Sequence, residues 1–365
     1  MKFICERNIL LKEISIAQEI ITSKSVISIL SNIYFEAEND VLTIKATDMK
    51  VNFETKVPVT VIEPGFALVF GDKFFGIINA APEGEIEFEH KDNKVKIKTY
   101  VKKDNFQLKS MASDKFPDFP VSSSKYFEMP VKDFKEMINQ TIFAISDDET
   151  RYFMNGVYLE KSGEKIVMVA TDGRRLAYIE KEMSGIEDFS GIVIPPKILN
   201  VISKRAGDEG MISVSIDNKI IFIRLGSYNL SSALIEGQFP NYRKVIPESQ
   251  ENSITVNRIE MIDSLKRVSL LVEQKSHKIY IGLKPGTMAI YSEEGEITEE
   301  ALVEIPCKYD GEDISLALNY HYIEDPFRVI NSEEVCMKFS GPNKAITLVP
   351  VPETDFFHIV MPMQS

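Results

Sequence analysis

The sequence predicts an α+β protein built from three copies of one domain. Each copy should have two helices on one side of two small antiparallel sheets, with about eight strands in all. Short motifs recur at a nearly constant spacing through the 365 residues. Each copy holds two segments with helical spacing of apolar residues, and the rest reads as short β-type runs joined by turn residues. No βαβ pattern and no glycine-rich nucleotide loop is visible, which favours α+β over a doubly wound α/β fold.

Three recurring motifs define the copies. Ala46-Thr47-Asp48 matches Ala170-Thr171-Asp172, 124 residues later, and Phe116-Pro117-Asp118-Phe119 matches Phe239-Pro240-Asn241-Tyr242, 123 residues later. The pair Asn-Lys occurs at 93, 218 and 343, and each pair opens a β-type run. In the third copy, Tyr291-Ser292-Glu293 takes the Ala-Thr-Asp position. We therefore predict domains at 1–123, 124–249 and 250–365, and a triplication instead of a solenoid, because the period is a whole domain.

The first helix of each copy follows a short alternating strand. Apolar residues recur at helical spacing from Ile9, from Phe134 and from Ile259. Pro130 is a natural helix starter, and Asn257 is a typical N-cap. The expected first helices cover residues 7–24, 131–143 and 257–271.

A second helical pattern lies in the middle of each copy, within residues 71–82, 195–207 and 319–331. Pro326 falls inside the last of these windows. Because proline lacks an N–H group and its ring clashes with the preceding turn, we expect it to kink or split that helix.

The charge of the chain is unevenly distributed. The net charge is −13, but the six helix windows together carry +4, so the other residues carry −17. If the helices of all three domains face one way, they form a weakly positive surface on an acidic protein. The alternative is that Lys and Arg simply occupy exposed helix faces.

Composition describes an ordinary globular protein, with 44% hydrophobic and 27% charged residues. No apolar run approaches 18 residues, and the start lacks a signal-peptide layout, so we expect no membrane partner. Cys5, Cys307 and Cys336 are far apart and include no CxxC pair. We therefore expect a reducing, cytoplasmic location, and neither a disulfide framework nor a zinc cluster.

Signatures of catalysis are absent from the sequence. The four histidines have no metal-ligand spacing, and no GxSxG, Walker A or GxGxxG motif occurs. The strongest enzymatic candidate is a set of carboxylates, Asp172 with Asp147 and Asp148, which could bind Mg²⁺ in a hydrolase. Asp48 holds the equivalent position in the first copy, so the favoured interpretation is that this aspartate stabilises a turn used twice. We predict no catalytic residue, no metal and no cofactor.

The octapeptide from Ala170 to Ala177 is the most informative stretch of the chain. Asp172-Gly173 is a strong turn signal, because glycine reaches positive φ at no cost and aspartate can bond its own backbone. Arg174 and Arg175 stand beside this turn. Their side chains must either point into solvent or meet a partner.

These motifs, in this order, resemble the bacterial DNA sliding clamp, the β subunit of DNA polymerase III. The similarity extends along the whole chain. Its specific parts are Met1-Lys2-Phe3, Lys73-Phe74-Phe75, Arg151 to Gly156, Ala170 to Ala177, Phe239 to Pro247 and Val360-Met361-Pro362-Met363. The resemblance implies a head-to-tail homodimeric ring that encircles duplex DNA without reading its sequence and tethers a polymerase to it. A ring of six helices, each about 10 Å wide, would leave about 9 Å clear, whereas twelve would leave about 28 Å, so two chains are needed.

The resemblance also implies a hydrophobic cleft between the second and third domains that receives short peptides. The partners would be the polymerase III α subunit, the clamp-loader δ subunit and other proteins with clamp-binding motifs. The family pattern places these residues there: Met154, Thr171, Gly173, Arg174, Arg175, Leu176, Pro240, Lys244, Val245, Asn343, Ala345, Ile359, Val360, Met361, Pro362 and Met363.

Two further sets follow from the same resemblance and from the helix charges. The expected DNA-binding residues are Lys24, Asp148, Tyr152, Phe153, Lys197, Lys204 and Arg205. The expected dimer-interface residues are Lys73, Phe74, Phe106, Leu108, Leu270 and Leu271.

The chain departs from the family pattern at several positions. Lys24 stands where arginine is frequent, Arg174 replaces a frequent histidine, and Gln364 replaces a common basic residue. Lys24 and Gln364 bear on DNA contact and partner specificity, and Pro326 bears on the last helix.

Overall fold

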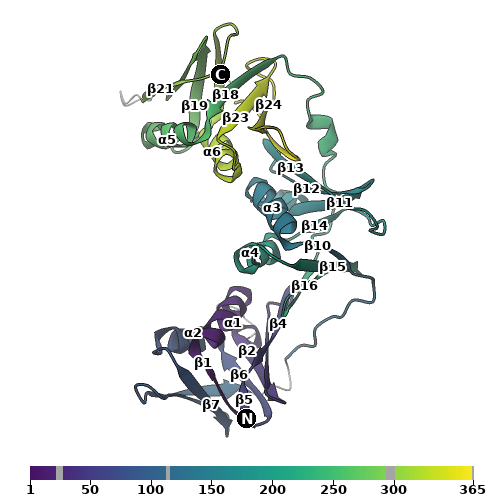
Figure 1. Cartoon of the computed structure of the whole chain (residues 1–365), viewed down its shortest axis with the longest axis vertical. Coiled ribbons are helices and arrows are strands. Elements are labelled where there is room, and N and C mark those ends of the chain that lie inside the picture. The colour runs from purple at the N-terminus through teal and green to yellow at the C-terminus, as the bar shows by residue number, and fades with distance from the viewer. Residues whose placement is uncertain (22–27, 112–115, 293–300, 364–365) are drawn as a thin grey trace. The chain divides into compact units, whose positions relative to one another are not determined.

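The computed structural model describes residues 1–21, 28–111, 116–292 and 301–363 (Figure 1). Its contacts divide the chain into two compact units. Unit 1 comprises Met1–Phe134 and Lys197–Leu234, and unit 2 comprises Lys135–Pro196 and Ile235–Ser365. Lys24, Glu293 and Gln364 lie outside the described residues.

All six predicted helices are confirmed, and each is two to four residues shorter than its window. Within the described ranges they are α1 (Arg7–Ile20), α2 (Gly71–Ala80), α3 (Val131–Thr141), α4 (Pro196–Arg205), α5 (Arg258–Val268) and α6 (Tyr320–Val329). In α1 the buried residues Leu10, Ile14 and Ala17 follow the helical period, so one face of the helix lies in the core.

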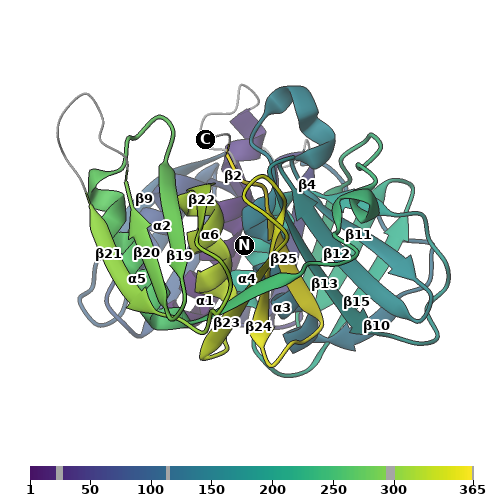
Figure 2. The same cartoon turned by 90° about the horizontal axis from the view of Figure 1, so that it is seen from above.

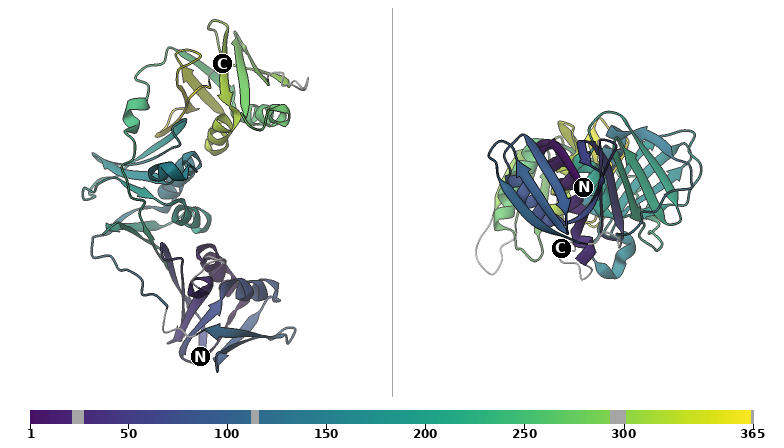
Figure 3. Two further views of the ribbon diagram at one scale, coloured as in Figure 1. Left: turned by 180° about the vertical axis from the view of Figure 1, so that it is seen from behind. Right: turned by 90° about the horizontal axis from the view of Figure 1, so that it is seen from below.

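Unit 1 contains one continuous antiparallel sheet. Its order is β10-β15-β16-β17-β4-β3-β2-β6-β9-β8-β7-β1-β5. The bounds are β1 (Lys2–Glu6), β2 (Asn32–Glu38), β3 (Val41–Thr47), β4 (Val51–Pro58), β5 (Thr60–Glu63), β6 (Gly65–Phe70), β7 (Glu85–Lys91), β8 (Lys94–Thr99), β9 (Asn105–Met111), β10 (Phe127–Pro130), β15 (Met211–Asp217), β16 (Ile220–Leu225) and β17 (Tyr228–Ala233). Helices α1 and α2 lie beside each other against one side of this unit's strands (Figure 3).

Unit 2 contains two antiparallel sheets, with orders β14-β11-β12-β13-β25-β24-β23-β18 and β21-β20-β19-β22. The bounds are β11 (Val157–Ser162), β12 (Lys165–Thr171), β13 (Arg175–Glu182), β14 (Ile192–Ile194), β18 (Asn252–Asn257), β19 (Lys278–Lys284), β20 (Thr287–Tyr291), β21 (Leu302–Pro306), β22 (Ile314–Asn319), β23 (Glu334–Phe339), β24 (Ile346–Val351) and β25 (Phe356–Val360). Strands β13 and β25 run side by side although they are far apart in sequence (Figure 2).

Two strand pairs join successive sequence repeats. In unit 1, β4 pairs with β17, with Phe53 opposite Leu230. In unit 2, β13 pairs with β25, with Ala177 opposite His358. Phe53 and Ala177 are 124 residues apart, which is the spacing of the Ala-Thr-Asp motif, so the same strand of the repeat makes both junctions.

The expectation that Pro326 would split the last helix is wrong, whereas a kink at Pro326 stays a prediction. Helix α6 continues from Tyr320 to Val329, and the N–H of Ile330 still bonds the carbonyl of Pro326. Proline removes one backbone bond, but Pro326, Ile323 and Phe327 are buried, and this packing holds the helix together. Asn319 caps the helix, accepting from the backbone N–H of His321.

Within the described residues, no helix is long and apolar enough to cross a membrane.

Candidate functional site

The turn between β12 and β13 is held by its own side chains. Asp172 accepts hydrogen bonds from the backbone N–H groups of Arg174, at 2.8 Å, and Arg175, at 3.0 Å. The Thr171 hydroxyl accepts from the N–H of Gly173 and donates to the carbonyl of Arg175. Gly173 has φ = +88°, the conformation that favours glycine. The predicted turn is therefore confirmed.

The first copy repeats this arrangement at Thr47 and Asp48. The Thr47 hydroxyl accepts from the N–H of Met49, and Asp48 accepts from the N–H groups of Lys50 and Val51. These bonds, and an ion pair with Lys197, hold the pKa of Asp48 below its usual value despite burial, which acts in the opposite direction. The favoured interpretation of the repeated aspartate, as a turn stabiliser, is confirmed.

Two of the three carboxylates of the alternative magnesium site, Asp172 and Asp148, bond neighbouring groups. The second oxygen of Asp172 accepts from Nε of Arg175 at 3.0 Å. Asp148 accepts from Thr150 and pairs with Arg151, which lowers its pKa to about 2. Among the residues that the structure describes, no group of three histidine, cysteine, aspartate or glutamate side chains could hold a metal ion.

The two arginines of the turn have different roles. Arg174 is exposed, whereas the Arg175 side chain is only 13% exposed. Arg175 bonds Asp325 of α6 at 2.6 Å and the carbonyl of Phe143 at 2.6 Å, and it lies 4.7 Å from the Tyr322 ring. Its guanidinium joins β13 to α6 inside unit 2, and its place in a partner-binding surface stays a prediction.

The chain terminus continues the contact between β13 and β25. Val360 lies opposite Arg175, and Ile359 lies opposite Leu176. The N–H of Met361 then bonds the carbonyl of Arg174, and the N–H of Met363 bonds the carbonyl of Ala317. The predicted residues from Ile359 to Met361 and from Arg174 to Leu176 are thus brought together by backbone pairing, whereas Met363 pairs with Ala317.

An apolar cluster includes residues of β13 and β25. We call it the junction cluster; its buried members are Val167, Val169, Leu176, Val193, Phe239, Tyr242 and Ile359, and Tyr158, Tyr178, Ile235, Ile246, Ala345 and Phe357 pack against it. Leu176, Ile359 and Ala345 were predicted for the peptide site. Sequence reasoning missed the β-strand valines, which have no distinguishing signal. Phe239 and Tyr242 could have been found, since they form one of the repeated motifs.

The other predicted peptide-site residues differ in how much of each is exposed. Met154 and Thr171 are buried, whereas Val245 is 53% exposed and Met361 is 42% exposed. Gly173, Lys244 and Asn343 are exposed, and Pro240, Pro362 and Met363 are half-buried. The arrangement is a buried apolar floor with exposed apolar and basic side chains nearby.

Glu160 fixes the polar side of the junction cluster. It accepts from the hydroxyls of Tyr242 and Tyr158 and pairs with Arg243. Burial, followed by these bonds, raises the pKa of both tyrosines. The phenols therefore stay protonated and act as fixed donors, while their rings face the cluster.

The predicted DNA-binding residues are spread over both units. In unit 2, Tyr152 is 52% exposed, and Asp148 caps a short 3₁₀ helix, Glu149–Met154, that also contains Phe153. In unit 1, Lys197 pairs with Asp48. Lys204 and Arg205 both pair with Glu19 of α1. Their charges are thus partly compensated within the unit.

The predicted dimer residues divide into exposed and buried groups. Leu270 is 79% exposed and Leu271 is 41% exposed. Phe106 and Leu108 are half-buried on β9, and Lys73 is exposed. The prediction for Phe74 is wrong: its side chain has 0% exposure and packs edge-on against the rings of Phe35 and Phe88. Its neighbour Lys73 points outward because successive helix residues lie about 100° apart.

Comparison with known proteins identifies the same family for every part of the chain. Sequence models of the DNA polymerase III beta subunit match with the N-terminal domain at residues 1–120, the central domain at 128–241 and the C-terminal domain at 243–364. The beta sliding clamp of Treponema pallidum is 45% identical over 371 residues, and the match covers all of both chains.

Solved structures agree. The sliding clamp (DNA polymerase III subunit beta) of Pseudomonas aeruginosa, bound to griselimycin, has a TM-score of 0.93 at 25% identity. The clamp of Bartonella birtlesii, also bound to griselimycin, has a TM-score of 0.94 at 25% identity. Both matches cover 100% of each chain.

Proposed function

The chain belongs to the family of bacterial β sliding clamps, the non-catalytic β subunits of DNA polymerase III, and from this premise we propose that two copies close head to tail into a ring around duplex DNA. The observation that carries the proposal is the family match along the entire chain. Its domains would have the boundaries expected from the repeats, 1–123, 124–249 and 250–365, and the protein would act in the cytoplasm.

Free strand edges support the closure of the ring. In unit 1, β9 pairs with β8 along Asn105–Lys109 and meets β6 only at Ser110 and Met111. In unit 2, β21 ends its sheet, and among the described strands it pairs only with β20. An open edge is a template for pairing with another chain. We propose that β9 of one copy meets β21 of the other, with Phe106 and Leu108 near Leu270 and Leu271.

The mode of DNA binding follows from charge. The helices carry the small positive excess, and Lys197, Lys204 and Arg205 already have carboxylate neighbours within 3.4 Å. Weak, sequence-independent phosphate contacts would keep the ring mobile on the duplex. The acidic remainder of the chain would repel DNA from other surfaces.

The junction cluster would receive the partner peptides. Exposed Met361 and Val245 are apolar side chains beside a buried apolar floor, and flexible methionine accommodates different anchors. We propose that the polymerase III α subunit, the clamp-loader δ subunit and other proteins with clamp-binding motifs bind here.

Retention on DNA tests the ring. The protein is loaded on a nicked circular plasmid by its matched clamp loader and ATP, and half of the sample is then linearised at a salt concentration that screens loose phosphate binding. We expect retention on circles and loss from linear ends. The Leu270→Asp/Leu271→Asp double variant should be monomeric and fail on circles. Met211→Asp, which changes another exposed apolar side chain, is the control. Equal retention on both DNA forms contradicts the ring.

Peptide binding is tested separately by fluorescence anisotropy. The probe is a labelled peptide with the clamp-binding motif of the α subunit from the same organism. Met361→Asp should weaken binding at least about tenfold, because it places a charge beside apolar anchors. Met211→Asp, which changes a methionine of unit 1 that is 50% exposed, is the matched control. Equal affinities of the two variants would contradict a peptide site at the junction cluster.

A further inference from the structure

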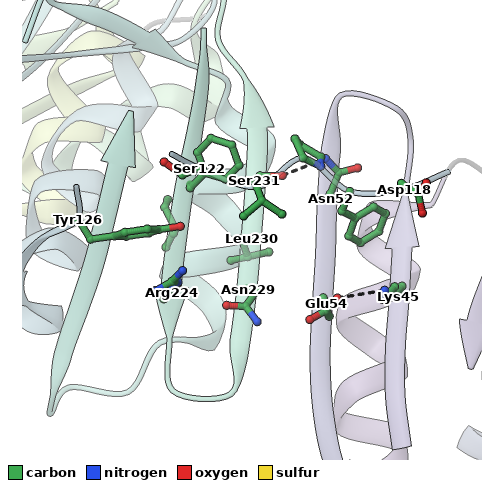
Figure 4. Close-up of a pocket in the computed structure, with 15 residues that line it drawn as sticks. Lys45, Asn52, Glu54, Asp118, Ser122, Tyr126, Arg224, Asn229, Leu230 and Ser231 are labelled. Atoms are coloured by element: carbon green, nitrogen blue, oxygen red, sulfur yellow. Dashed lines mark hydrogen bonds and ion pairs between the residues drawn. The ribbon is translucent and has the colours of Figure 1, made fainter. Parts of the chain in front are cut away.

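Unit 1 contains a cavity of about 380 Å³ that none of the functions above uses. It lies between the extended segment Asp118–Tyr126, which we call the strap, and one face of the sheet (Figure 4). Its lining comprises Lys45, Asn52, Glu54, Asp118, Phe119, Pro120, Val121, Ser122, Tyr126, Phe222, Ile223, Arg224, Asn229, Leu230 and Ser231. Its volume suits a few amino-acid side chains.

The strap is fixed at both ends of the cavity. Before it, the Phe116 ring stacks on Tyr34 with centroids 5.1 Å apart. Toward its far end, the Ser122 hydroxyl bonds that of Ser215 at 2.8 Å, and Ser123 donates to Asp217 from both its N–H and its hydroxyl. The cavity wall is therefore built by specific contacts, and a ligand would not need to order it.

A row of polar side chains forms the cavity floor. Lys45, Glu54, Asn229 and Arg224 lie directly opposite one another on β3, β4, β17 and β16. Lys45 and Glu54 form an ion pair at 3.3 Å, so their charges compensate. Arg224 is at the other end of the row, close to Tyr126 (Figure 4).

Arg224 has donors available for a ligand. Its guanidinium lies 4.0 Å from the centre of the Tyr126 ring, and in the part of the chain that the structure describes no carboxylate is within ion-pair distance of it. Stacking uses the face of the guanidinium and leaves its N–H groups in the plane, where they can bind a carboxylate with two bonds. Asn229, directly opposite and exposed, adds an amide.

The remaining lining selects among anions. Asp118 places a carboxylate beside the compensated Lys45–Glu54 pair, so a polyanion such as DNA would be repelled there. Phe119 and Val121 of the strap offer apolar surface; Phe119 is half-buried, and Val121 is 84% exposed. We propose that this cavity binds a peptide segment of a partner protein, with an acidic side chain on Arg224 and an apolar neighbour against Phe119 and Val121.

Saturation-transfer NMR on the full chain tests this site with two probes, acetyl-Leu-Glu-amide and its uncharged counterpart acetyl-Leu-Gln-amide. We expect the glutamate peptide to bind at least about tenfold more tightly than the glutamine peptide. Arg224→Gln should remove this preference. Lys96→Gln, which removes a lysine from another exposed strand face of unit 1, should leave it unchanged. Unaltered thermal unfolding of Arg224→Gln would show that the fold is intact.

Two further measurements test the role of Tyr126 and the preference for a peptide over a simple anion. Tyr126→Leu should weaken the glutamate peptide, since the ring positions the guanidinium. Inorganic phosphate should compete poorly because of Asp118. Equal binding of the two peptides, an unchanged preference in Arg224→Gln, absence of binding at 10 mM of either peptide (on the order of the weakest useful affinity), or phosphate binding as tight as the peptide would each overturn the proposal. None of these outcomes bears on the ring or the junction cluster.

Discussion

In unit 1, the cation of the β4–β17 junction is Lys197 of α4, which reaches the turn before β4. In unit 2, the cation of the β13–β25 junction is Arg175, which stands beside the turn itself and reaches α6. Lys197 binds Asp48 of the turn at 2.5 Å, and Arg175 binds Asp325 of the helix at 2.6 Å. The repeated fold has kept the ion pair and exchanged the elements that supply its cation.

Both cations also satisfy a backbone carbonyl at the end of the first helix of a repeat. Lys197 donates to Ile20, the last residue of α1, and Arg175 donates to Phe143 in the 3₁₀ turn that follows α3. Carbonyls at helix ends lack partners within the helix. The shared requirement is therefore a cation at this carbonyl, and either flanking element can provide it.

The two solutions differ in burial and in the number of bonds. The Arg175 side chain is 13% exposed and binds two carboxylates, a carbonyl and an aromatic ring. The Lys197 side chain is 34% exposed and binds one carboxylate and one carbonyl. Removing the more buried cation should leave more buried groups unpaired, so we expect the second junction to be the more sensitive one.

The largest effect is expected from Arg175→Met, which keeps most of the side-chain volume and removes the charge. Asp172, Asp325 and the Phe143 carbonyl would lose their partner, and the free energy of unfolding should fall by about 3–5 kcal/mol. Urea unfolding followed by circular dichroism measures this change. Arg174→Met, at the exposed neighbouring position, should stay within about 0.5 kcal/mol of the parent. A loss below about 1 kcal/mol in Arg175→Met would contradict the role of Arg175.

Acid should weaken the same junction through His358. This residue is fully buried between the rings of Phe143 and Phe356, and its Nε2–H donates to Gln140 at 3.0 Å. Burial lowers its pKa to about 3, whereas the unfolded value is near 6.5. The unfolded chain therefore takes up the proton first as the pH falls.

The stabilisation is thus complete above pH 6.5 and is lost progressively toward pH 3, by up to about 1.4 kcal/mol per pH unit. Urea unfolding between pH 7.5 and 5 should show this slope in the parent protein. His358→Gln, which can still donate to Gln140 but does not titrate, should have a flatter profile. Identical slopes in the two proteins would rule out His358 as the source.

Lys197→Met is the counterpart of Arg175→Met in unit 1. Because Lys197 is more exposed and water can replace part of its contacts, we expect a loss of about 1–2 kcal/mol, measured under the same conditions. Lys12→Met, which changes another lysine of unit 1, serves as the control and should be close to neutral. If Lys197→Met lowered the free energy of unfolding as much as Arg175→Met, the burial of the cation would not determine how much it stabilises its junction.

These contacts mark the limit of what the sequence predicts. Periodicity and turn residues place all six helices, because both depend on neighbouring residues. The repeat also identifies Asp48 and Asp172 as equivalent turn residues. Nothing local distinguishes Arg174 from Arg175, since the partner of Arg175 at Asp325 is 150 residues away. The burial of Phe74 depends in the same way on rings from other strands.

The candidate site was predicted in part for the same reason. Resemblance to the family supplies Leu176, Ile359 and Ala345, which the structure brings into one cluster. Val193 has no motif, and it enters the cluster because its strand, β14, pairs with β11. Pro326 shows the opposite error, because a strong local rule was overridden by burial of the helix around it.

The smallest effect is expected from Ser231→Ala on β17. The Ser231 hydroxyl accepts from the Asn52 amide of β4 at 2.9 Å, a neutral contact across the first junction. Its removal should lower the free energy of unfolding by about 0.5–1.5 kcal/mol. Asn52→Ala should cost more, because the Asn52 side-chain oxygen also accepts from the Thr47 hydroxyl at 2.6 Å. In the double variant the two losses should not add, because both changes delete the same bond. Full additivity would mean that the hydroxyl and the amide act separately, and the cations would then be the main polar link between the strands.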